Sequence, residues 1–265
     1  MQIVTSRDGT TIAFEQTGVG PALILVGGMF EQRALDTETA RLAANPLLAQ
    51  YFTVIHYDRR GRGDSGDTLP FAVAREIDDL AALIDAAGGQ ACLFGISSGA
   101  ALAFEAALAL GDKVRRLAIY EPPYNDDPEA RAGWRVFRQD LTAALAEGRR
   151  ADAVGLLMML MGVPAEQLPE MQQYPMWPMW EAVAPTIAYD AAALGDEAAV
   201  PAERAARLAT PTLILDGELS YPFMHASADA LAQAMPHALR RTLLGQTHEV
   251  APEALSPMLL DFFQR

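Results

Sequence analysis

The chain has 265 residues, 51% of them hydrophobic, so it can bury the core of one large α/β domain or of a core domain with an insertion. Its formal net charge of −14 argues against nucleic acids and anionic membrane surfaces as partners, because both are negatively charged. We find no apolar run of about eighteen residues and no secretory leader, and therefore expect a soluble cytoplasmic protein. The single cysteine, Cys92, lies in an apolar run and is expected to be a buried hydrophobic residue.

The N-terminal half alternates strand-like and helix-like segments. Residues 2–5 and 11–17 alternate polar and apolar side chains around Asp8-Gly9, a hairpin signal that predicts an antiparallel edge. Continuous apolar runs predict strands that are buried on both faces. In chain order, we expect strands at 22–26, 52–58, 91–96 and 114–121. Helices are expected at 36–49, at 72–87 and after the 91–96 strand as far as about residue 110. This alternation predicts a parallel sheet with helices on both faces.

The pattern changes between residues 125 and 207, where helix-like segments follow one another without clear strands. We expect a helical insertion, or lid, at 125–207 and a core domain made of 1–124 and 208–265. The insertion is rich in Met and Trp, which fit either an ordinary core or the wall of an apolar, adaptable pocket. After it, we expect strands at 211–217 and 239–244 and helices at 223–234 and from 252.

The segment Gly95-Ile96-Ser97-Ser98-Gly99 joins an apolar strand to an Ala-rich helix. In this context the pattern Gly-x-Ser-x-Gly predicts a sharp strand-to-helix turn that exposes the hydroxyl of Ser97. Glycines suit both flanks because so tight a turn leaves no room for Cβ atoms. A Gly/Ser turn with no chemical role is the alternative interpretation.

Four ordered segments together resemble the α/β-hydrolase superfamily, in its form with a helical cap, over nearly the whole chain. They are Leu25-Val26-Gly27-Gly28-Met29, residues 57–65 (Tyr-Asp-Arg-Arg-Gly-Arg-Gly-Asp-Ser), the Ser97 segment and Gly245-Gln246-Thr247-His248. The resemblance implies a mostly parallel eight-stranded sheet with helices on both faces, a cap insertion, and a serine nucleophile at position 97.

A serine nucleophile needs a base, and the chain has four histidines. Only His248 follows the last expected strand, where the family places its base. His56 lies within a strand and His237 opens one. His225 begins a helix and is expected at the surface or in the substrate pocket, and action on the substrate is its alternative role.

The third member of the triad departs from the family pattern. The usual aspartate stands three residues after the glycine that ends the penultimate strand, and here that position is Ser220. A hydroxyl cannot stabilise an imidazolium as a carboxylate does. Some haloalkane dehalogenases of the superfamily carry the acid after the preceding strand, and this resemblance implies Glu121. Glu218, Asp216 within the strand, or a site without an acid remain alternatives.

An acyl transfer also needs hydrogen-bond donors for the developing oxyanion. The backbone N–H groups of Ser98 and, by the resemblance, Met29 are the expected donors. Many relatives have histidine at position 27, so Gly27 is expected to widen the site and to admit a branched substrate. Other expected pocket residues are Gly28, Phe30, Met159, Trp177, Trp180 and His225.

The arginine cluster after the second parallel strand has two interpretations. Arg59, Arg60 and Arg62 could bind an anion, but we expect them to brace their loop by pairing with Asp58 and Asp64.

The expected function is hydrolysis of a small or medium apolar ester, thioester or lactone. We expect no metal and no cofactor, since no His/Cys/Asp cluster has ligand spacing and no phosphate-binding glycine loop is present. Two rivals remain: a lyase, cyclase or C–C bond hydrolase that uses Ser97 and His248 as an acid–base pair, and a binding protein without turnover. The sequence leaves open whether the protein is a monomer or a homodimer.

Overall fold

The computed structural model describes all residues, 1–265, and contains one eight-stranded sheet. Its strands are β1 (Gln2–Thr5), β2 (Thr11–Thr17), β3 (Ala22–Val26), β4 (Thr53–Tyr57), β5 (Ala91–Ile96), β6 (Val114–Tyr120), β7 (Thr212–Gly217) and β8 (Ala238–Leu243). Their order across the sheet is β1-β2-β4-β3-β5-β6-β7-β8. β2 pairs antiparallel with β1 and β4, and all other pairs are parallel. The predicted fold class is confirmed.

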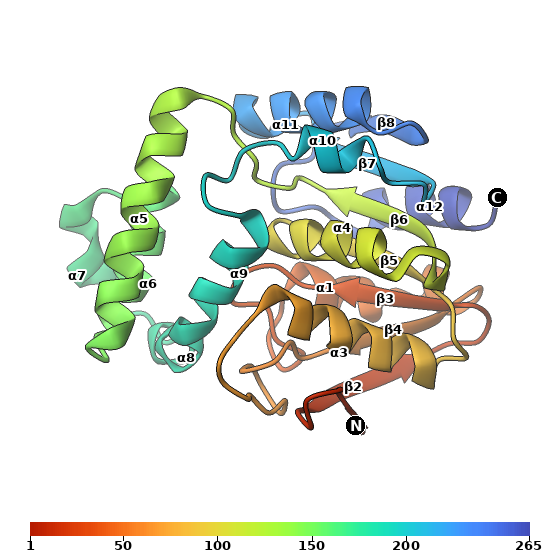
Figure 1. Cartoon of the computed structure of the whole chain (residues 1–265), viewed down its shortest axis with the longest axis horizontal. Helices are drawn as coiled ribbons and strands as arrows, with labels where there is room; N and C mark the ends of the chain where they lie inside the picture. The colour runs from red at the N-terminus through yellow and green to blue at the C-terminus, as the bar shows by residue number, and fades with distance from the viewer.

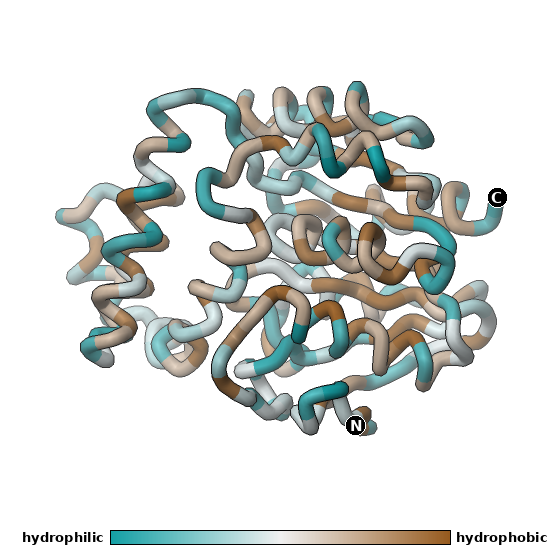
Figure 2. Tube along the Cα trace, in the orientation of Figure 1, coloured by the Kyte–Doolittle hydropathy of each residue, from teal (hydrophilic) through white to brown (hydrophobic).

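Helices cover both faces of this sheet (Figure 1). α1 (Glu38–Ala43), α2 (Pro46–Ala49) and α12 (Pro252–Phe263) pack on one face, and α3 (Val73–Ala86), α4 (Ser98–Leu110) and α11 (Pro222–Ala234) pack on the other. The central strands are buried on both sides, so Leu23 and Leu25 belong to one core and Ile24 and Val26 to the other. Hydrophobic stretches accordingly run along the middle of the molecule in Figure 2.

The segment expected to be one helix at 36–49 is two short helices, α1 and α2. The side chain of Asn45 accepts a hydrogen bond from the backbone N–H of Leu47 at 2.9 Å and so caps a new helix. Pro46 occupies the first turn of α2, where its missing N–H costs nothing. A helix cannot continue through Pro46, because its ring would clash with the preceding turn.

Between β6 and β7 the chain forms helices and no strand. They are α5 (Pro128–Ala146), α6 (Arg150–Leu160), α7 (Leu168–Met171), α8 (Trp177–Val183), α9 (Ile187–Leu194) and α10 (Ala202–Ala205). In Figure 1, α5 to α8 lie at the end of the molecule toward which the arrows of β3 and β6 point. α9 packs against α4 and so joins this insertion to the core. No helix is long and apolar enough to cross a lipid bilayer.

Candidate active site

Ser97 stands on a strained turn between β5 and α4. Its backbone angles are φ 55° and ψ −130°, and its N–H donates to the carbonyl of Tyr120 on the neighbouring strand at 2.9 Å. The flanking glycines are required sterically. A Cβ at Gly95 would lie 2.5 Å from the Gly99 carbonyl oxygen, and one at Gly99 would lie 2.3 Å from the carbonyl oxygen of Val26. Real Cβ atoms do not make such contacts, so only glycine allows α4 to start so close to the sheet.

Glu121 and His248 are brought together at the carboxyl end of the sheet. Glu121 directly follows β6, the neighbour of β5, and its side chain is fully buried. Its Oε2 lies 2.6 Å from Nδ1 of His248, which comes from the loop after β8. The same carboxyl group accepts the N–H of Gly217 at 2.7 Å and the hydroxyl of Ser220 at 2.8 Å.

These contacts define the protonation pattern of the imidazole. An ionised carboxylate can only accept hydrogen bonds, so Nδ1 of His248 is the donor to Glu121. In the neutral ring, Nε2 is then unprotonated and can act as a base. The His248 side chain is about one third exposed.

The alternative carboxylates face elsewhere. Glu218 is exposed, and its Oε2 accepts the N–H of Gly245 at 2.9 Å. Asp216 pairs with Arg240 and with His225. His225 thus has its own carboxylate partner, which is separate from the pair formed by Glu121 and His248.

Strained backbone is concentrated in this region. Only four non-glycine residues have a positive φ: Phe30 at 63°, Ser97 at 55°, Glu121 at 49° and Ala198 at 46°. Each such conformation costs about 1–3 kcal/mol and persists where surrounding contacts impose it, typically at functional sites. The first three belong to segments that were singled out from the sequence as site residues. The residue types Phe, Ser and Glu do not by themselves predict a positive φ at these three positions.

The loop after β3 lies against Ser97. A Cβ at Gly28 would lie 3.2 Å from the Cβ of Ser97, so the backbone of Gly28 borders the elbow. Met29 follows it and packs half-buried on the core. Ser98 is the first residue of α4, and its N–H is among those that have no acceptor within the helix.

The expectation that Gly27 widens the site is wrong. A Cβ at Gly27 would lie 2.5 Å from Oε2 of Glu31, because the buried side chain of Glu31 fills that space. Burial raises the pKa of Glu31 to about 8, while a hydrogen bond from the hydroxyl of Thr39 acts in the opposite direction. At neutral pH this carboxyl group is therefore mostly protonated. Sequence reasoning missed Glu31, since no motif marks it.

Three of the expected pocket residues form an aromatic cluster beside this loop. Phe30 stacks on Trp180 with ring centroids 5.6 Å apart, and Trp180 meets the edge of Trp177 at 6.0 Å. Trp177 is buried, and its Nε1 donates to Glu181 at 2.5 Å. Met159 lies outside the cluster, at the end of α6, and is 39% exposed.

The arginine cluster is paired, but with partners other than the two expected ones. Arg59 donates to both oxygens of Glu76 at 2.8 and 2.9 Å, Arg60 pairs with Asp79 and Asp8, and Arg62 pairs with Asp190 of α9. Asp58 and Asp64, the expected partners, both accept from Arg33. Proximity in the sequence predicted pairing with the nearest carboxylates, whereas the arginines pair in the fold with carboxylates that are distant in the chain.

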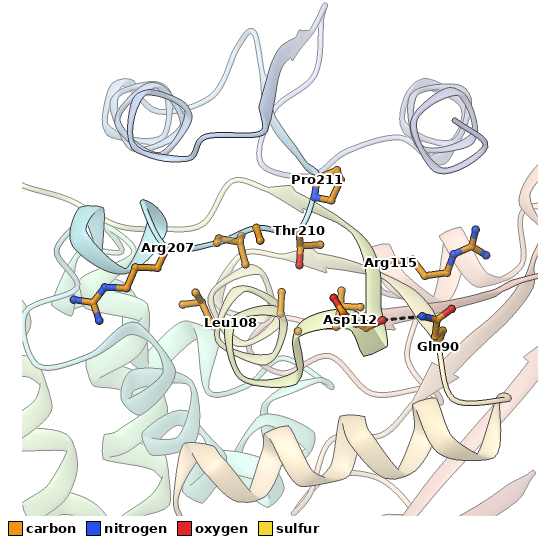
Figure 3. A pocket seen from close by; sticks show the side chains of 12 residues that line it. Gln90, Leu108, Asp112, Arg115, Arg207, Thr210 and Pro211 are labelled. Carbon is orange, nitrogen blue, oxygen red and sulfur yellow. Dashed lines mark hydrogen bonds between the residues drawn. The ribbon is translucent and has the colours of Figure 1, made fainter.

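One cavity of about 520 Å³ lies at the opposite end of the sheet, between the end of α4 and the starts of β6 and β7 (Figure 3). The side chains of Arg115 and Arg207 extend away from one another there. It is separate from the elbow, which follows the carboxyl end of β5.

Comparison with known proteins defines the class. Residues 23–257 match the alpha/beta hydrolase family, so the chain belongs to this family and is a hydrolase. An alpha/beta hydrolase from Sphaerobacter thermophilus is 50% identical to it, with 99% of this chain and 100% of that chain covered and a TM-score of 0.85. A thermophilic esterase from Thermogutta terrifontis is 25% identical (99% and 97% covered, TM-score 0.71). An enol-lactonase from Burkholderia xenovorans shares the fold at 20% identity (100% of both chains covered, TM-score 0.70).

Proposed function

We propose that this protein is a serine hydrolase that cleaves a small or medium apolar ester, thioester or lactone with Ser97, His248 and Glu121. The observation that carries the proposal is the 2.6 Å contact between His248 and the buried Glu121 carboxylate. Glu121 directly follows β6, and Ser97 follows the neighbouring strand β5. A carboxylate in this position holds the imidazole in its basic tautomer and stabilises the imidazolium that forms.

The reaction follows from these roles. The Oγ of Ser97 attacks the carbonyl carbon while Nε2 of His248 takes its proton. The backbone N–H groups of Met29 and Ser98 receive the negative charge on the carbonyl oxygen. His248 then protonates the leaving alcohol or thiol, and the acyl-enzyme is released by a water molecule that His248 deprotonates in turn.

The preference for apolar, uncharged substrates has two supports. The half-buried rings of Phe30 and Trp180, backed by the buried Trp177, offer an aromatic surface beside the expected oxyanion hole. The buried guanidinium groups nearby are occupied by carboxylates of the protein, so they are not available to a substrate anion. The helical insertion, residues 125–207, supplies both tryptophans and in this proposal acts as the cap over the site.

Labelling with a fluorophosphonate probe tests the proposal. Wild type should be labelled and should hydrolyse a short-chain aryl ester, and Ser97→Ala should lose the label and at least ~10³-fold in kcat, as expected when a nucleophile is removed. Ser256→Ala is the matched control. Ser256 is a fully buried serine of α12, so its variant should keep the label.

Each remaining outcome is informative. An unlabelled, folded wild type would contradict the proposal and favour a binding protein. Labelling of Ser97 with no turnover of esters, thioesters or lactones would contradict the substrate class and favour C–C bond hydrolysis or a lyase reaction.

A further inference from the structure

We propose that Asp190, which comes from the insertion, is a positioning residue for the oxyanion hole. In this proposal it ties both expected hydrogen-bond donors to helix α9, so that the hole is fully formed only when α9 is docked on the core. The inference rests on the function proposed above and adds a role for the insertion in the chemical step.

Asp190 is fully buried in the interface between α9 and α4. Its Oδ1 accepts the hydroxyl of Ser98 at 2.9 Å and also an N–H of Arg59. Its Oδ2 accepts an N–H of Arg62. A single carboxylate from the insertion therefore contacts the residue after the nucleophile and two arginines of the core.

Arg62 transmits this contact to the second donor. One of its terminal nitrogens, Nη1, donates to the carbonyl of Gly28 at 2.5 Å, while its Nε donates to Thr186, also from the insertion, at 3.0 Å. The carbonyl of Gly28 and the N–H of Met29 belong to the same planar peptide group and point in opposite directions. Fixing the carbonyl on one side therefore fixes the N–H on the other, and the hydrogen bond polarises that N–H into a stronger donor.

Arg59 supports the preceding peptide group in the same way. Its Nη1 donates to the carbonyl of Gly27 at 3.2 Å, and its other nitrogens hold Glu76. Two consecutive carbonyls of the loop are thus held by buried guanidinium groups.

The charges of this cluster balance only when Asp190 is present. Arg59 and Arg62 are both buried, and Glu76 and Asp190 are the two carboxylates that pair with them. Burial and the neighbouring Arg59 lower the pKa of Arg62, and the charge of Asp190 acts against this. Without the Asp190 charge, two buried cations would share one anion, which costs free energy and loosens the guanidinium that holds Gly28.

The test compares Asp190→Asn with Asp196→Asn. Asp196 is an exposed carboxylate just beyond α9 that pairs with Arg138, and its variant should behave as wild type. For Asp190→Asn, kcat on an aryl ester should fall by ~10–10²-fold with KM changed by less than about threefold, because an oxyanion hole acts on the transition state. A trifluoromethyl ketone, which forms an oxyanion adduct on the serine, should bind more weakly by a similar factor.

Ser98→Ala is the second variant, and it tests the inference if Asp190→Asn does not fold. It removes one contact of Asp190 and leaves both guanidinium groups paired, so it should fold and lower kcat and ketone affinity by about 3–10-fold. Unchanged kcat and ketone affinity in the folded variants, or a change in KM alone, would overturn the inference. Those results would leave the proposed function intact as long as wild type is labelled by the fluorophosphonate. An unlabelled wild type would instead remove the proposed function itself.

Discussion

The two carboxylate oxygens of Glu121 accept hydrogen bonds from three donors, two near the end of β7 and one after β8. The N–H of Gly217 ends β7, Ser220 lies in the next turn, and His248 follows β8. The hydroxyl of Ser220, at the position of the family's usual acid, thus donates to Glu121, the acid of the proposed triad. Because the carboxylate is buried and held from three sides, its orientation, and with it that of the imidazole, has little freedom.

Replacement of this carboxylate measures its contribution. Glu121→Gln should lower kcat on a short-chain aryl ester by ~10²–10⁴-fold, because an amide neither selects the basic tautomer nor stabilises the imidazolium. Glu218→Gln, which changes an exposed side chain two residues before Ser220, is the matched control and should stay near wild type. Equal activity of Glu121→Gln and wild type would show that another group orients His248.

A double variant tests whether a carboxylate at position 220 can replace the one at position 121. Ser220→Asp in the background of Glu121→Gln places a carboxylate at the family's usual position, on a residue whose hydroxyl now lies 2.8 Å from Oε2 of Glu121. It should recover part of the lost kcat. Ser220→Asp alone should lose stability, since two carboxylates would then crowd one buried site.

At the scale of elements, the elbow depends on how closely α4 approaches the sheet. The first turn of α4 packs on the end of β3, and a side chain at Gly99 would meet backbone oxygens of Val26 and Gly27 at 2.3 and 2.5 Å. Backbone atoms cannot move aside as a flexible side chain can. The same contact therefore positions both Ser97 and the loop that carries Met29, one of the two expected oxyanion donors.

Two Gly→Ala variants in helices should have opposite effects. Gly99→Ala should destabilise the protein by about 3 kcal/mol or more, since it forces α4 away from β3. Gly133→Ala in α5 has no atom within 4 Å of the new methyl group and should stabilise by about 0.5–1 kcal/mol, the usual helix preference of alanine over glycine. Urea unfolding at fixed pH measures both. A stable, active Gly99→Ala would contradict the close packing described here.

The elements themselves followed from local pattern where the pattern was strong. Buried strands read as apolar runs, and α3 and α12 appeared near their expected positions. The segment 36–49 is helical but divided in two, because the Asn45 cap and Pro46 begin a new helix, which the apolar spacing did not indicate.

At the scale of the whole molecule, buried charges join the insertion to the core. Asp190 of α9 pairs with Arg59 and Arg62 of the loop after β4, and the backbone carbonyl of Glu31 accepts from Arg62. Such groups make global stability depend on their ionisation.

Glu31 gives this dependence a definite sign. Its pKa is raised to about 8 in the folded protein, chiefly by burial and further by the neighbouring Glu38. A glutamate in the unfolded chain loses its proton near pH 4.5, so between about pH 4.5 and 8 the folded state binds more protons. Folding stability from this group then falls as pH rises, by about 1.4 kcal/mol per pH unit.

Replacement by glutamine removes this penalty. Relative to wild type, Glu31→Gln should become progressively more stable between pH 5 and 8, by up to a few kcal/mol, with no further gain above pH 8. Unfolding curves at several pH values measure the difference. Glu203→Gln, at an exposed position of α10, is the control and should differ from wild type by a constant amount. A constant difference for Glu31→Gln as well would mean that this carboxyl group is ionised in the folded state.

The sequence by itself determined the class of fold, the elbow at Ser97 and the position of His248 after the last strand. These features depend on residues within one or two elements, where periodicity, glycine spacing and order along the chain carry the information. Only the tertiary structure decided which carboxylate meets His248, that Glu31 fills the space at Gly27, and that Asp190 pairs with the arginines. Those contacts join residues that lie far apart in the chain or opposite one another in a loop, and their geometry depends on how strands and helices are placed side by side.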